Sequence, residues 1–430
     1  MKFALVNPHW DFQGSVYFGC PEPHLPLEFG YAAALLRQSG HQVLIVDAHL
    51  HNLCVAETAS RVDAFSPAVT LLATAPTYLF WRCPPPELRL PQLFAAGLRQ
   101  TGGLLLAVGP HGSATPGAVL DKLPVDGLLR GEFEELLPLF ADRDWRQIPG
   151  IAYREGEGVR LRGKPGVADL SRLPPLTWPA DWLGRHRHHH HRFDADPQGP
   201  GAEVESSRGC PYHCLFCAKE NFRGIYRRRP LPLVLQELDG LLAQGVEYVY
   251  FIDEIFLPDS PLLNALAERR LRFGIQTRID LWPPPALERL GAAGCVSIEA
   301  GVESLSVEGR RRMGKPCHLT TEQLAERLAL AKAHVPFVQA NLLLSEDDDP
   351  AETAAWRRDL IARGVWVNDP VPLFPFPGSG AYRQRWGEPD DLAWERAHAW
   401  YLDHHPCLSD LQDRQPQPLA TLEASGAWHG

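Results

Sequence analysis

The feature that most constrains the fold is a regular alternation of short apolar runs with longer helical patterns, seen first in residues 1–140. This alternation is typical of parallel strands joined by crossover helices, because such strands are buried on both faces. The predicted strands are 2–6, 42–46, 69–73, 104–108 and 127–129, and helices are predicted at 27–39 and 92–100. The first half is therefore predicted to be an α/β domain with a Rossmann-like parallel sheet, whose ligand would bind at the carboxyl ends of the strands.

A second alternation begins near residue 203 and continues to about residue 382. Its predicted helices are 233–243, 284–292 and 321–334, and its predicted strands are 203–206, 248–252, 274–278, 295–299, 337–343 and 365–370. Six strand–helix units are too few for a closed eight-stranded barrel. We therefore expect a partial (β/α)6 barrel that is open on one side.

The residues between these two regions lack the alternation. Segments 151–154 and 159–162 predict a hairpin, and the prolines that follow predict a linker. The expected domains are a Rossmann-like domain at 1–140, a linker with the hairpin and a histidine-rich segment at 141–200, the partial barrel at 201–385, and a tail with a helix near 392–400 at 386–430.

Composition excludes several classes of protein. A formal net charge of -10 argues against a general nucleic-acid binder, because neutralising phosphates requires a basic surface. The basic run 223–229 does not reverse this balance, and a solvated face is favoured for it over an anion clamp. The opening apolar run is too short for a signal peptide, and no apolar stretch is long enough to span a membrane. A cytoplasmic protein is expected.

Three of the nine cysteines, Cys210, Cys214 and Cys217, lie within eight residues in a loop that follows a predicted strand. Three thiolates in one loop can hold three corners of a cubane iron–sulfur cluster. Ferredoxins normally supply a fourth cysteine and zinc sites normally present two separated pairs, so this triplet predicts an iron reserved for a small molecule. A zinc or disulfide knot is the less favoured alternative.

This triplet and the segments around it resemble the radical S-adenosylmethionine (SAM) superfamily. The resemblance implies a [4Fe-4S] cluster on the three cysteines, with SAM bound to the open iron and cleaved reductively to a 5'-deoxyadenosyl radical. It also implies a role for Phe216 near the adenine of SAM and for Arg278 at the SAM carboxylate or the substrate. An acidic motif, Asp253 and Glu254, would accept hydrogen bonds from the SAM ammonium. A Gly-x-Glu-Ser element, which contains Glu303 and Ser304, would lie near the ribose and methionine. For these strand-end motifs a capping or ion-pair role is the alternative. Segment 344–349 departs from the family, whose members usually carry glycine and proline there.

Several segments of the first half are similar to the cobalamin-binding domain of one radical SAM class, namely 5–8, 26–30, 46–47, 108–112 and 130–132. The resemblance implies a cobalamin whose nucleotide tail runs near 109–113, with contacts from Asn7, Thr74, Gly109, His111, Gly112 and Ser113. A cobalamin bound without a protein histidine is expected, because the Asp47-Ala48-His49 element follows the second strand and Asn52 replaces the usual glycine. A domain that has lost cobalamin and serves as a docking platform is the alternative.

The favoured function is a cobalamin-dependent radical SAM enzyme that transfers a methyl group from methylcobalamin to an unactivated carbon of a small molecule. One alternative is a radical SAM enzyme that cyclises or rearranges its substrate without methylation, and another is a non-catalytic iron–sulfur or metal-binding scaffold. The enzyme would need an external one-electron donor such as flavodoxin or ferredoxin. For the histidine-rich segment 186–191, a substrate-facing role and a solvated loop are equally open.

Overall fold

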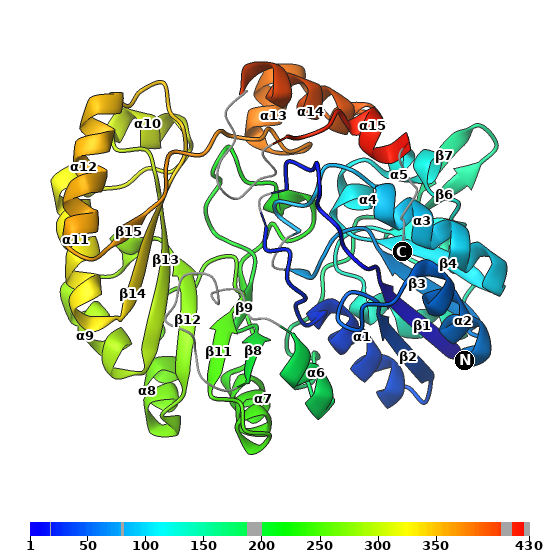
Figure 1. Cartoon of the computed structure of the whole chain (residues 1–430). Helices are drawn as coiled ribbons and strands as arrows, with labels where there is room; N and C mark the ends of the chain where they lie inside the picture. Colours follow the sequence, from blue (N-terminus) through cyan, green and yellow to red (C-terminus); the bar gives the residue numbers. More distant parts are fainter. Residues whose placement is uncertain (18, 79–80, 187–199, 406–414, 425–430) are drawn as a thin grey trace. The chain divides into compact units, whose positions relative to one another are not determined.

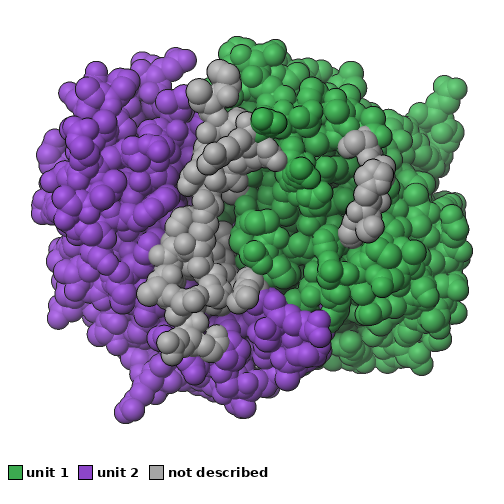
Figure 2. Space-filling view, in the orientation of Figure 1, with its two compact units in different colours: residues 1–178, 217–224, 374–430 green, residues 179–216, 225–373 purple. Residues whose placement is uncertain are grey.

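The computed structural model describes residues 1–17, 19–78, 81–186, 200–405 and 415–424. Contacts within the chain define two compact units, which are coloured in Figure 2. Unit 1 comprises Met1–Trp178, Cys217–Gly224 and Phe374–Gly430, and unit 2 comprises Pro179–Phe216 and Ile225–Leu373. Unit 1 is therefore discontinuous in sequence, and it includes a short piece that begins at the third cysteine of the triplet.

The sheet of unit 1 has the order β2-β1-β3-β4-β5-β6-β7 (Figure 1). Its strands are β1 (Lys2–Asn7), β2 (Gln42–Asp47), β3 (Val69–Ala73), β4 (Leu104–Val108), β5 (Gly127–Leu129), β6 (Ile151–Glu155) and β7 (Gly158–Leu161). The first five are parallel, which confirms the predicted Rossmann-like sheet. Because the strand order reverses between β1 and β3, the loops after these strands diverge and open a crevice where ligands bind in such folds.

The hairpin of β6 and β7 extends this sheet. The sequence suggested that it lies in a linker, but β6 pairs with β5 in antiparallel fashion, through Leu128 with Ala152 and Leu129 with Ile151. The short strand β5 would otherwise be a sheet edge with unpaired backbone groups, and the hairpin supplies partners for them. As a domain boundary, the division at residue 140 stays a prediction.

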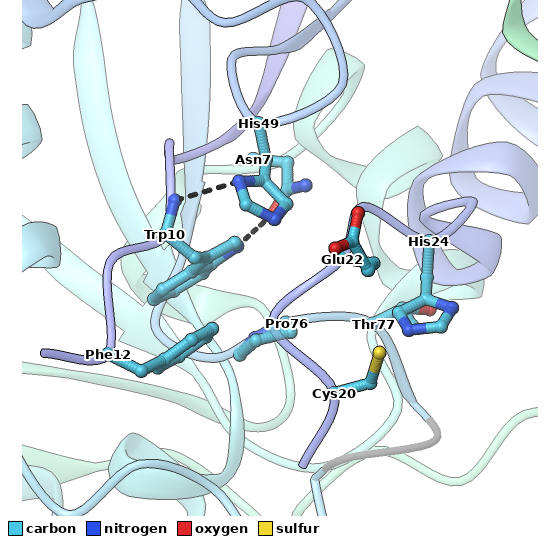
Figure 3. A pocket seen from close by; sticks show the side chains of 9 residues that line it. All are labelled: Asn7, Trp10, Phe12, Cys20, Glu22, His24, His49, Pro76 and Thr77. Carbon is cyan, nitrogen blue, oxygen red and sulfur yellow. Dashed lines mark hydrogen bonds between the residues drawn. The ribbon is translucent and has the colours of Figure 1, made fainter. Parts of the chain in front are cut away.

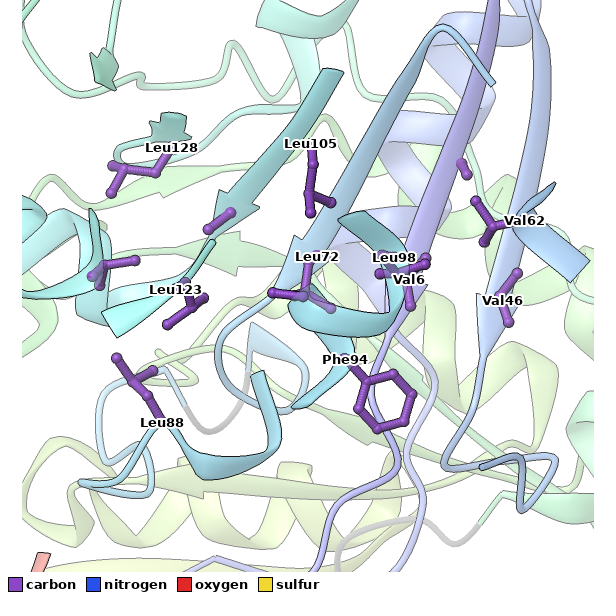
Figure 4. Packing of buried hydrophobic residues seen from close by; sticks show 14 of the residues in the cluster. Val6, Val46, Val62, Leu72, Leu88, Phe94, Leu98, Leu105, Leu123 and Leu128 are labelled. Atoms are coloured by element: carbon purple, nitrogen blue, oxygen red, sulfur yellow. The ribbon is translucent and has the colours of Figure 1, made fainter. Parts of the chain in front are cut away.

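Helices α2 (Val55–Phe65), α3 (Arg89–Leu98) and α5 (Pro116–Lys122) bury a core against one face of this sheet (Figure 4). Unit 1 also contains α1 (Leu27–Gln38) and α4 (Pro110–Ala114), which contribute no residue to this cluster. In β1, Ala4 and Val6 join this core, which also contains Phe94 of α3 and Val119 of α5. Phe3 and Leu5 point to the other face and are equally buried. Both faces of the sheet are therefore covered, as the unbroken apolar runs predicted.

Unit 2 contains a six-stranded sheet of order β15-β14-β13-β12-β11-β8, all parallel. Its strands are β8 (Gly201–Val204), β11 (Tyr248–Phe251), β12 (Arg272–Thr277), β13 (Cys295–Glu303), β14 (Phe337–Leu342) and β15 (Trp366–Val367). The helices are α6 (Ala180–Arg185), α7 (Leu231–Ala243), α8 (Ser260–Arg269), α9 (Pro284–Ala292), α10 (Val307–Arg312), α11 (Thr321–His334) and α12 (Pro350–Ala362). The order ends at β15 and β8, which do not pair, so the predicted open partial barrel is confirmed.

Two strands of unit 2 differ most from their predicted bounds, and β8 and β12 each begin two residues earlier than predicted. Strand β13 continues to Glu303 instead of ending at residue 299, because its register with β14 shifts between Gly301 and Glu303 and the ladder resumes after the shift. Strand β15 is only Trp366–Val367, since it pairs with β14 at Gln339 and Ala340 alone.

The C-terminal segment supplies helices to unit 1, namely α13 (Gly380–Trp386), α14 (Ala393–His404) and α15 (Leu419–Ala424). Helix α14 confirms the helix predicted at 392–400. Its Trp394 donates an indole N–H to Thr115 Oγ1 over 2.9 Å and packs in an aromatic cluster with Phe374, Tyr382 and Tyr401. In the described part of the chain, every helix is too short or too polar to span a bilayer.

Candidate active site

The cysteine triplet follows the two-residue strand β9 (Ser207–Arg208), which pairs with β10 (Arg227–Arg228). The loop that carries it is fixed to the strand-end loops of unit 2. The Gly209 amide donates to Glu254 Oε2 over 2.7 Å, and the Leu215 amide donates to the Met313 carbonyl over 2.9 Å. Gly209 has a φ of +77°, which a residue with a side chain would adopt only at a cost. These contacts anchor the loop to the end of β11 and to the turn after α10, which is Val307–Arg312.

Cys210, Cys214 and Cys217 are reduced thiols and are partly exposed. Among the described residues, no three histidine, cysteine, aspartate or glutamate side chains converge on one point that could hold a single metal ion. A cubane does not require such convergence, because each of its irons takes one thiolate. Three thiols in an accessible loop therefore fit the donor set that a cubane with one open iron needs.

Asp253, which the family resemblance suggested for the SAM ammonium, is bound to the strand end that leads into this loop. Its carboxylate accepts hydrogen bonds from the Ser206 amide at 2.7 Å, the Ser206 hydroxyl at 2.5 Å and the Ser207 hydroxyl at 2.6 Å. Burial raises the pKa of Asp253 to about 6 against the lowering effect of these bonds. The contacts support the alternative structural role for Asp253, and its contact with SAM stays a prediction.

Arg278 lies next to the cysteine loop. Its guanidinium lies 4.3 Å from the ring centre of Tyr212, and it donates to both carboxylate oxygens of Asp280 and to the Pro316 carbonyl. The side chain is 5% exposed, yet Nη1 has no hydrogen-bond partner among the described residues. A buried guanidinium nitrogen without a partner is costly, and a carboxylate would satisfy it with a charge-assisted bond. This donor fits the predicted contact with the SAM carboxylate.

Glu303 and Ser304, the Gly-x-Glu-Ser residues, are held by partners that the sequence did not reveal. Lys315 Nζ donates to Glu303 Oε1 and to the Gly301 carbonyl, both over 2.7 Å, and Glu303 has a φ of +68°. Ser304 donates to Asp348 Oδ1 over 2.8 Å, and the same carboxylate accepts the amides of residues 305 and 306. Asp348 lies in segment 344–349, and its carboxylate anchors the loop after β13. Phe216 is half-buried.

In unit 1, the residues expected to contact cobalamin lie at the carboxyl ends of β3 and β4, except for Asn7 at the end of β1. Gly109 has a φ of +145°, and a Cβ on it would lie 2.1 Å from Thr74 Oγ1, so only glycine permits this approach. His111 Nε2 donates to the Pro85 carbonyl over 2.8 Å, which leaves Nδ1 to accept from Thr74 Oγ1 at 3.2 Å. These polar groups shape the loops and are themselves already satisfied.

Ser113 and Gly112 complete this edge. The Ser113 hydroxyl donates to the Gly109 carbonyl over 3.0 Å and accepts the Gly131 amide over 2.9 Å, which ties the loop after β4 to the loop after β5. A Cβ on Gly112 would lie 3.1 Å from the Leu128 side chain. Glycine here lets α4 pack closely on β5.

A pocket of about 220 Å³ opens at the ends of β1, β2 and β3 (Figure 3). It is lined by Asn7, Trp10, Phe12, Cys20, Glu22, His24, His49, Pro76 and Thr77. Asn7 donates to Asp47 Oδ1 over 3.0 Å and accepts the Trp10 indole N–H over 2.9 Å, so its amide fixes the loops on both sides.

His49 uses both ring nitrogens within this edge. Nδ1 accepts the Trp10 amide over 3.2 Å, and Nε2 therefore donates to the Pro21 carbonyl over 2.9 Å. Burial lowers the pKa of His49 to about 4, so the ring stays neutral near pH 7. A nitrogen that donates to a carbonyl is not available to a metal. The bonding of His49 supports the expectation of a cobalamin without a histidine from the protein.

Asp47 makes the stability of unit 1 depend on pH. It is fully buried, Oδ2 has no partner among the described residues, and burial raises the pKa of its carboxyl to about 7. Between the unfolded pKa near 3.8 and this value, the folded state holds a proton that the unfolded state has lost, so stability falls as pH rises. The free energy of unfolding should therefore fall between about pH 5 and about pH 8, and Asp47→Asn should remove on the order of 2–3 kcal/mol of that fall.

The measurement is the urea unfolding midpoint of the wild type and of Asp47→Asn at both pH values. Asp239→Asn is the control, because Asp239 is an exposed carboxylate whose pKa the Arg269 guanidinium lowers, so it stays ionised across this window. If the urea midpoint changed equally with pH in the wild type and in Asp47→Asn, the raised pKa assigned to Asp47 would be wrong.

Residues 204–356 match the family model of the radical SAM superfamily. The chain therefore contains a radical SAM domain. Members of this superfamily use a [4Fe-4S] cluster and SAM, so both are cofactors of this radical SAM enzyme. The matched range begins in β8 and ends in α12, and it contains the cysteine triplet and the strand ends of unit 2.

Two relatives extend the likeness of this radical SAM enzyme beyond the matched range. It is 23% identical over 367 residues to an uncharacterized methyltransferase of Pyrococcus horikoshii, which covers 82% of this chain and 76% of the relative. It is 22% identical over 386 residues to the anaerobic magnesium-protoporphyrin IX monomethyl ester cyclase of Rubrivivax gelatinosus, covering 82% of this chain and 64% of the cyclase. The chain thus spans less than two thirds of the cyclase.

Two solved structures share the fold. The radical SAM methyltransferase TsrM from Kitasatospora setae, with tryptophan and a SAM analogue bound, superimposes with a TM-score of 0.68 at 18% identity, covering 89% of this chain and 76% of TsrM. The cobalamin-dependent enzyme OxsB, with aqua-cobalamin and SAM bound, gives a TM-score of 0.64 at 16% identity, covering 98% of this chain and 57% of OxsB. These likenesses confirm the predicted fold class for this radical SAM enzyme.

Most of the histidine-rich segment lies outside the described residues, apart from His186. His186 is 5% exposed, its Nδ1 lies 3.2 Å from the Trp182 carbonyl, and its Nε2 lies 3.5 Å from Glu203 Oε2. This histidine is therefore part of the packing between α6 and β8.

Proposed function

We propose that this radical SAM enzyme is cobalamin-dependent and transfers a methyl group to an unactivated carbon of a small molecule. The observation that carries the proposal is the cysteine loop, which places three thiols within eight residues and lies beside Arg278, whose buried Nη1 has no partner among the described residues. The three thiols would hold a cluster with one open iron, and Arg278 would bind the carboxylate of an amino acid-like cofactor at that iron. The crevice at the β1–β3 reversal in unit 1 supports a second cofactor.

When bound, the cluster and SAM supply a 5'-deoxyadenosyl radical and cobalamin supplies the methyl group. The chain holds and orients these groups. Cys210, Cys214 and Cys217 would bind the three closed irons, and Arg278 Nη1 would donate to the SAM carboxylate. The remaining proposed SAM contacts are Phe216, Asp253, Glu254, Glu303 and Ser304. In unit 1, the loops shaped by Asn7, Thr74, Gly109, His111, Gly112 and Ser113 would receive the cobalamin.

The relatives support both parts of the proposal. The Pyrococcus relative is named a methyltransferase, and a further relative at 25% identity is the hopanoid C-3 methylase of Methylococcus capsulatus. TsrM has been solved with cobalamin and a [4Fe-4S] cluster bound. An external one-electron donor such as flavodoxin or ferredoxin would reduce the cluster. A cytoplasmic location is proposed from the clustered cysteines, which need a reducing compartment.

Cyclisation or rearrangement is the second candidate function. The observation that favours it is the similarity to the anaerobic cyclases of Rubrivivax gelatinosus and Cereibacter sphaeroides, at 22% and 24% identity. Such a reaction would use the same radical source but would leave the methyl group of SAM out of the product.

The experiment that separates the candidates uses SAM labelled in its methyl group, with anaerobically reconstituted enzyme, hydroxocobalamin and a chemical reductant. Methyl transfer predicts 5'-deoxyadenosine together with S-adenosylhomocysteine, and label in the substrate-derived product from an extract of small molecules. Formation of 5'-deoxyadenosine with no label outside SAM and its own fragments would favour cyclisation or rearrangement. Failure to form 5'-deoxyadenosine would favour the non-catalytic scaffold.

A further inference from the structure

The segment Cys217–Gly224, here called the post-cluster segment, begins at the third cysteine of the triplet and belongs to unit 1. It is a tight turn held by its own hydrogen bonds. The amides of Phe222 and Arg223 donate to the Lys219 carbonyl over 3.1 and 2.7 Å, and Lys219 Nζ donates to the Gly224 carbonyl over 3.1 Å. Because these bonds fix the turn, a displacement of Arg223 would carry the neighbouring residues with it.

Arg223 fastens this turn to the loop after β3. Its guanidinium lies 3.7 Å from the ring centre of Tyr78, and both side chains are 1% exposed. An arginine stacked on an aromatic ring away from water is a strong cation–π contact. The position of Tyr78 is itself set by Glu28 of α1, whose carboxylate accepts the Tyr78 amide over 3.2 Å and the Thr77 hydroxyl over 2.9 Å.

The charge of Arg223 also acts on Glu28. Burial raises the pKa of Glu28 to about 7, while the hydrogen bonds from Thr77 and Tyr78 and the charge of Arg223 oppose this rise. The guanidinium thus favours the ionised carboxylate, which is the form that accepts these bonds best. A buried cluster of Arg223, Tyr78 and Glu28 therefore links the turn, the loop after β3 and α1.

Two further contacts anchor the post-cluster segment. Phe222 meets Trp81 edge to face at 5.6 Å, and Trp81 is fully buried in the loop after β3. Asn221 donates to the Pro377 carbonyl over 2.8 Å, and a Cβ on Gly378 would lie 2.1 Å from Asn221 Oδ1. The turn therefore has little freedom to move independently of unit 1.

The loop after β3 is also the loop that carries Thr74, Pro76 and Thr77, at the crevice where we propose cobalamin. A ligand there must contact or displace this loop, and the loop is packed directly on residues that follow Cys217. We infer that Arg223 is a positioning residue that couples occupancy of the crevice at β1 and β3 to the iron–sulfur cluster held by Cys217. The inference rests on the proposed function and adds to it a means by which the cluster responds to the bound corrinoid.

The test is the midpoint reduction potential of the reconstituted cluster, followed by electron paramagnetic resonance, with and without hydroxocobalamin. Coupling is reciprocal, so a cofactor that binds the two redox states with affinities differing by tenfold shifts the potential by about 59 mV. We expect a shift of about this size in the wild type. The shift should be lost in Arg223→Met and in Tyr78→Leu, and partly retained in Arg223→Lys, which keeps the charge but not the planar stack.

Arg146→Met is the matched control, because Arg146 also belongs to unit 1 but stacks on Trp145 at 4.6 Å, in the segment before β6 and not in the loop after β3. It should keep the wild-type shift. If Arg223→Met does not fold, either Tyr78→Leu or Arg223→Lys is sufficient for the test. Two results overturn the inference and leave the proposed function standing. One is an equal shift of the reduction potential in the wild type and in the folded Arg223 and Tyr78 variants. The other is cobalamin binding to the wild type without any shift of the potential. A wild type that binds no cobalamin overturns both.

Discussion

Replacing Cys210, Cys214 and Cys217 together by alanine should abolish the [4Fe-4S] cluster and all formation of 5'-deoxyadenosine. The three thiols are the soft sulfur ligands that the cysteine loop offers to three corners of a cubane, and alanine has no donor atom to replace them. Iron and sulfide content after anaerobic reconstitution measures the cluster, and chromatography of the reaction with SAM and a reductant measures 5'-deoxyadenosine. Each single substitution should lose nearly as much cluster and 5'-deoxyadenosine formation, because a cluster held by two thiolates has a second exposed iron.

Cys54→Ser is the matched control for this experiment. Cys54 is also a partly exposed thiol, and it caps α2 by accepting the Glu57 amide on its sulfur, a role that a serine hydroxyl performs well. This variant should keep the iron content and the activity of the wild type. A triple variant that retains a stoichiometric cubane would show that other residues hold the cluster, and the assignment of the triplet would then be wrong.

Substituting Lys315 by methionine should destabilise unit 2 by about 3 kcal/mol, because it leaves Glu303 buried without its cation. The side chains of the pair are 7% and 11% exposed, and the Nζ to Oε1 distance is 2.7 Å. Lys315 also satisfies the Gly301 carbonyl, so methionine leaves that group without its side-chain donor. Because Glu303 is a proposed SAM contact, the affinity for SAM should fall as well. Hydrogen exchange of peptides from β13, together with thermal unfolding, measures the local and overall losses.

A double-mutant cycle separates the ion pair from the packing of its members. Lys315→Met combined with Glu303→Gln should lose less stability than the sum of the two single variants, since the double variant contains no unpaired charge. Arg272→Met is the control, because the Arg272–Glu247 pair has the ordinary distance of 3.0 Å but is 41% and 56% exposed. Its loss should not exceed about 1 kcal/mol. Additive losses at Lys315 and Glu303 would show that their ion pair does not stabilise β13.

The strands were predictable because parallel strands covered on both faces must be apolar throughout. Val69–Ala73 and Leu104–Val108 are predicted to the residue, and all but Leu104 are buried. Helix α11 is likewise predicted to the residue, and Thr320 and Gln323 form a capping box at its start. Helix α2 was not predicted, because only Thr58 and Val62 are buried in it and the apolar periodicity is correspondingly weak.

The sequence by itself determined the alternating α/β architecture, the open barrel and the cysteine triplet, because apolar periodicity and ligand spacing are local properties of the chain. Only the tertiary structure decided the partners that act on the site. Lys315 meets Glu303, Asp348 meets Ser304, and Arg223 reaches Tyr78 from 145 residues away in the chain. Such pairs depend on which strand ends become neighbours and how their loops pack. A single sequence contains no spacing rule for contacts of this kind, so they follow from the fold alone.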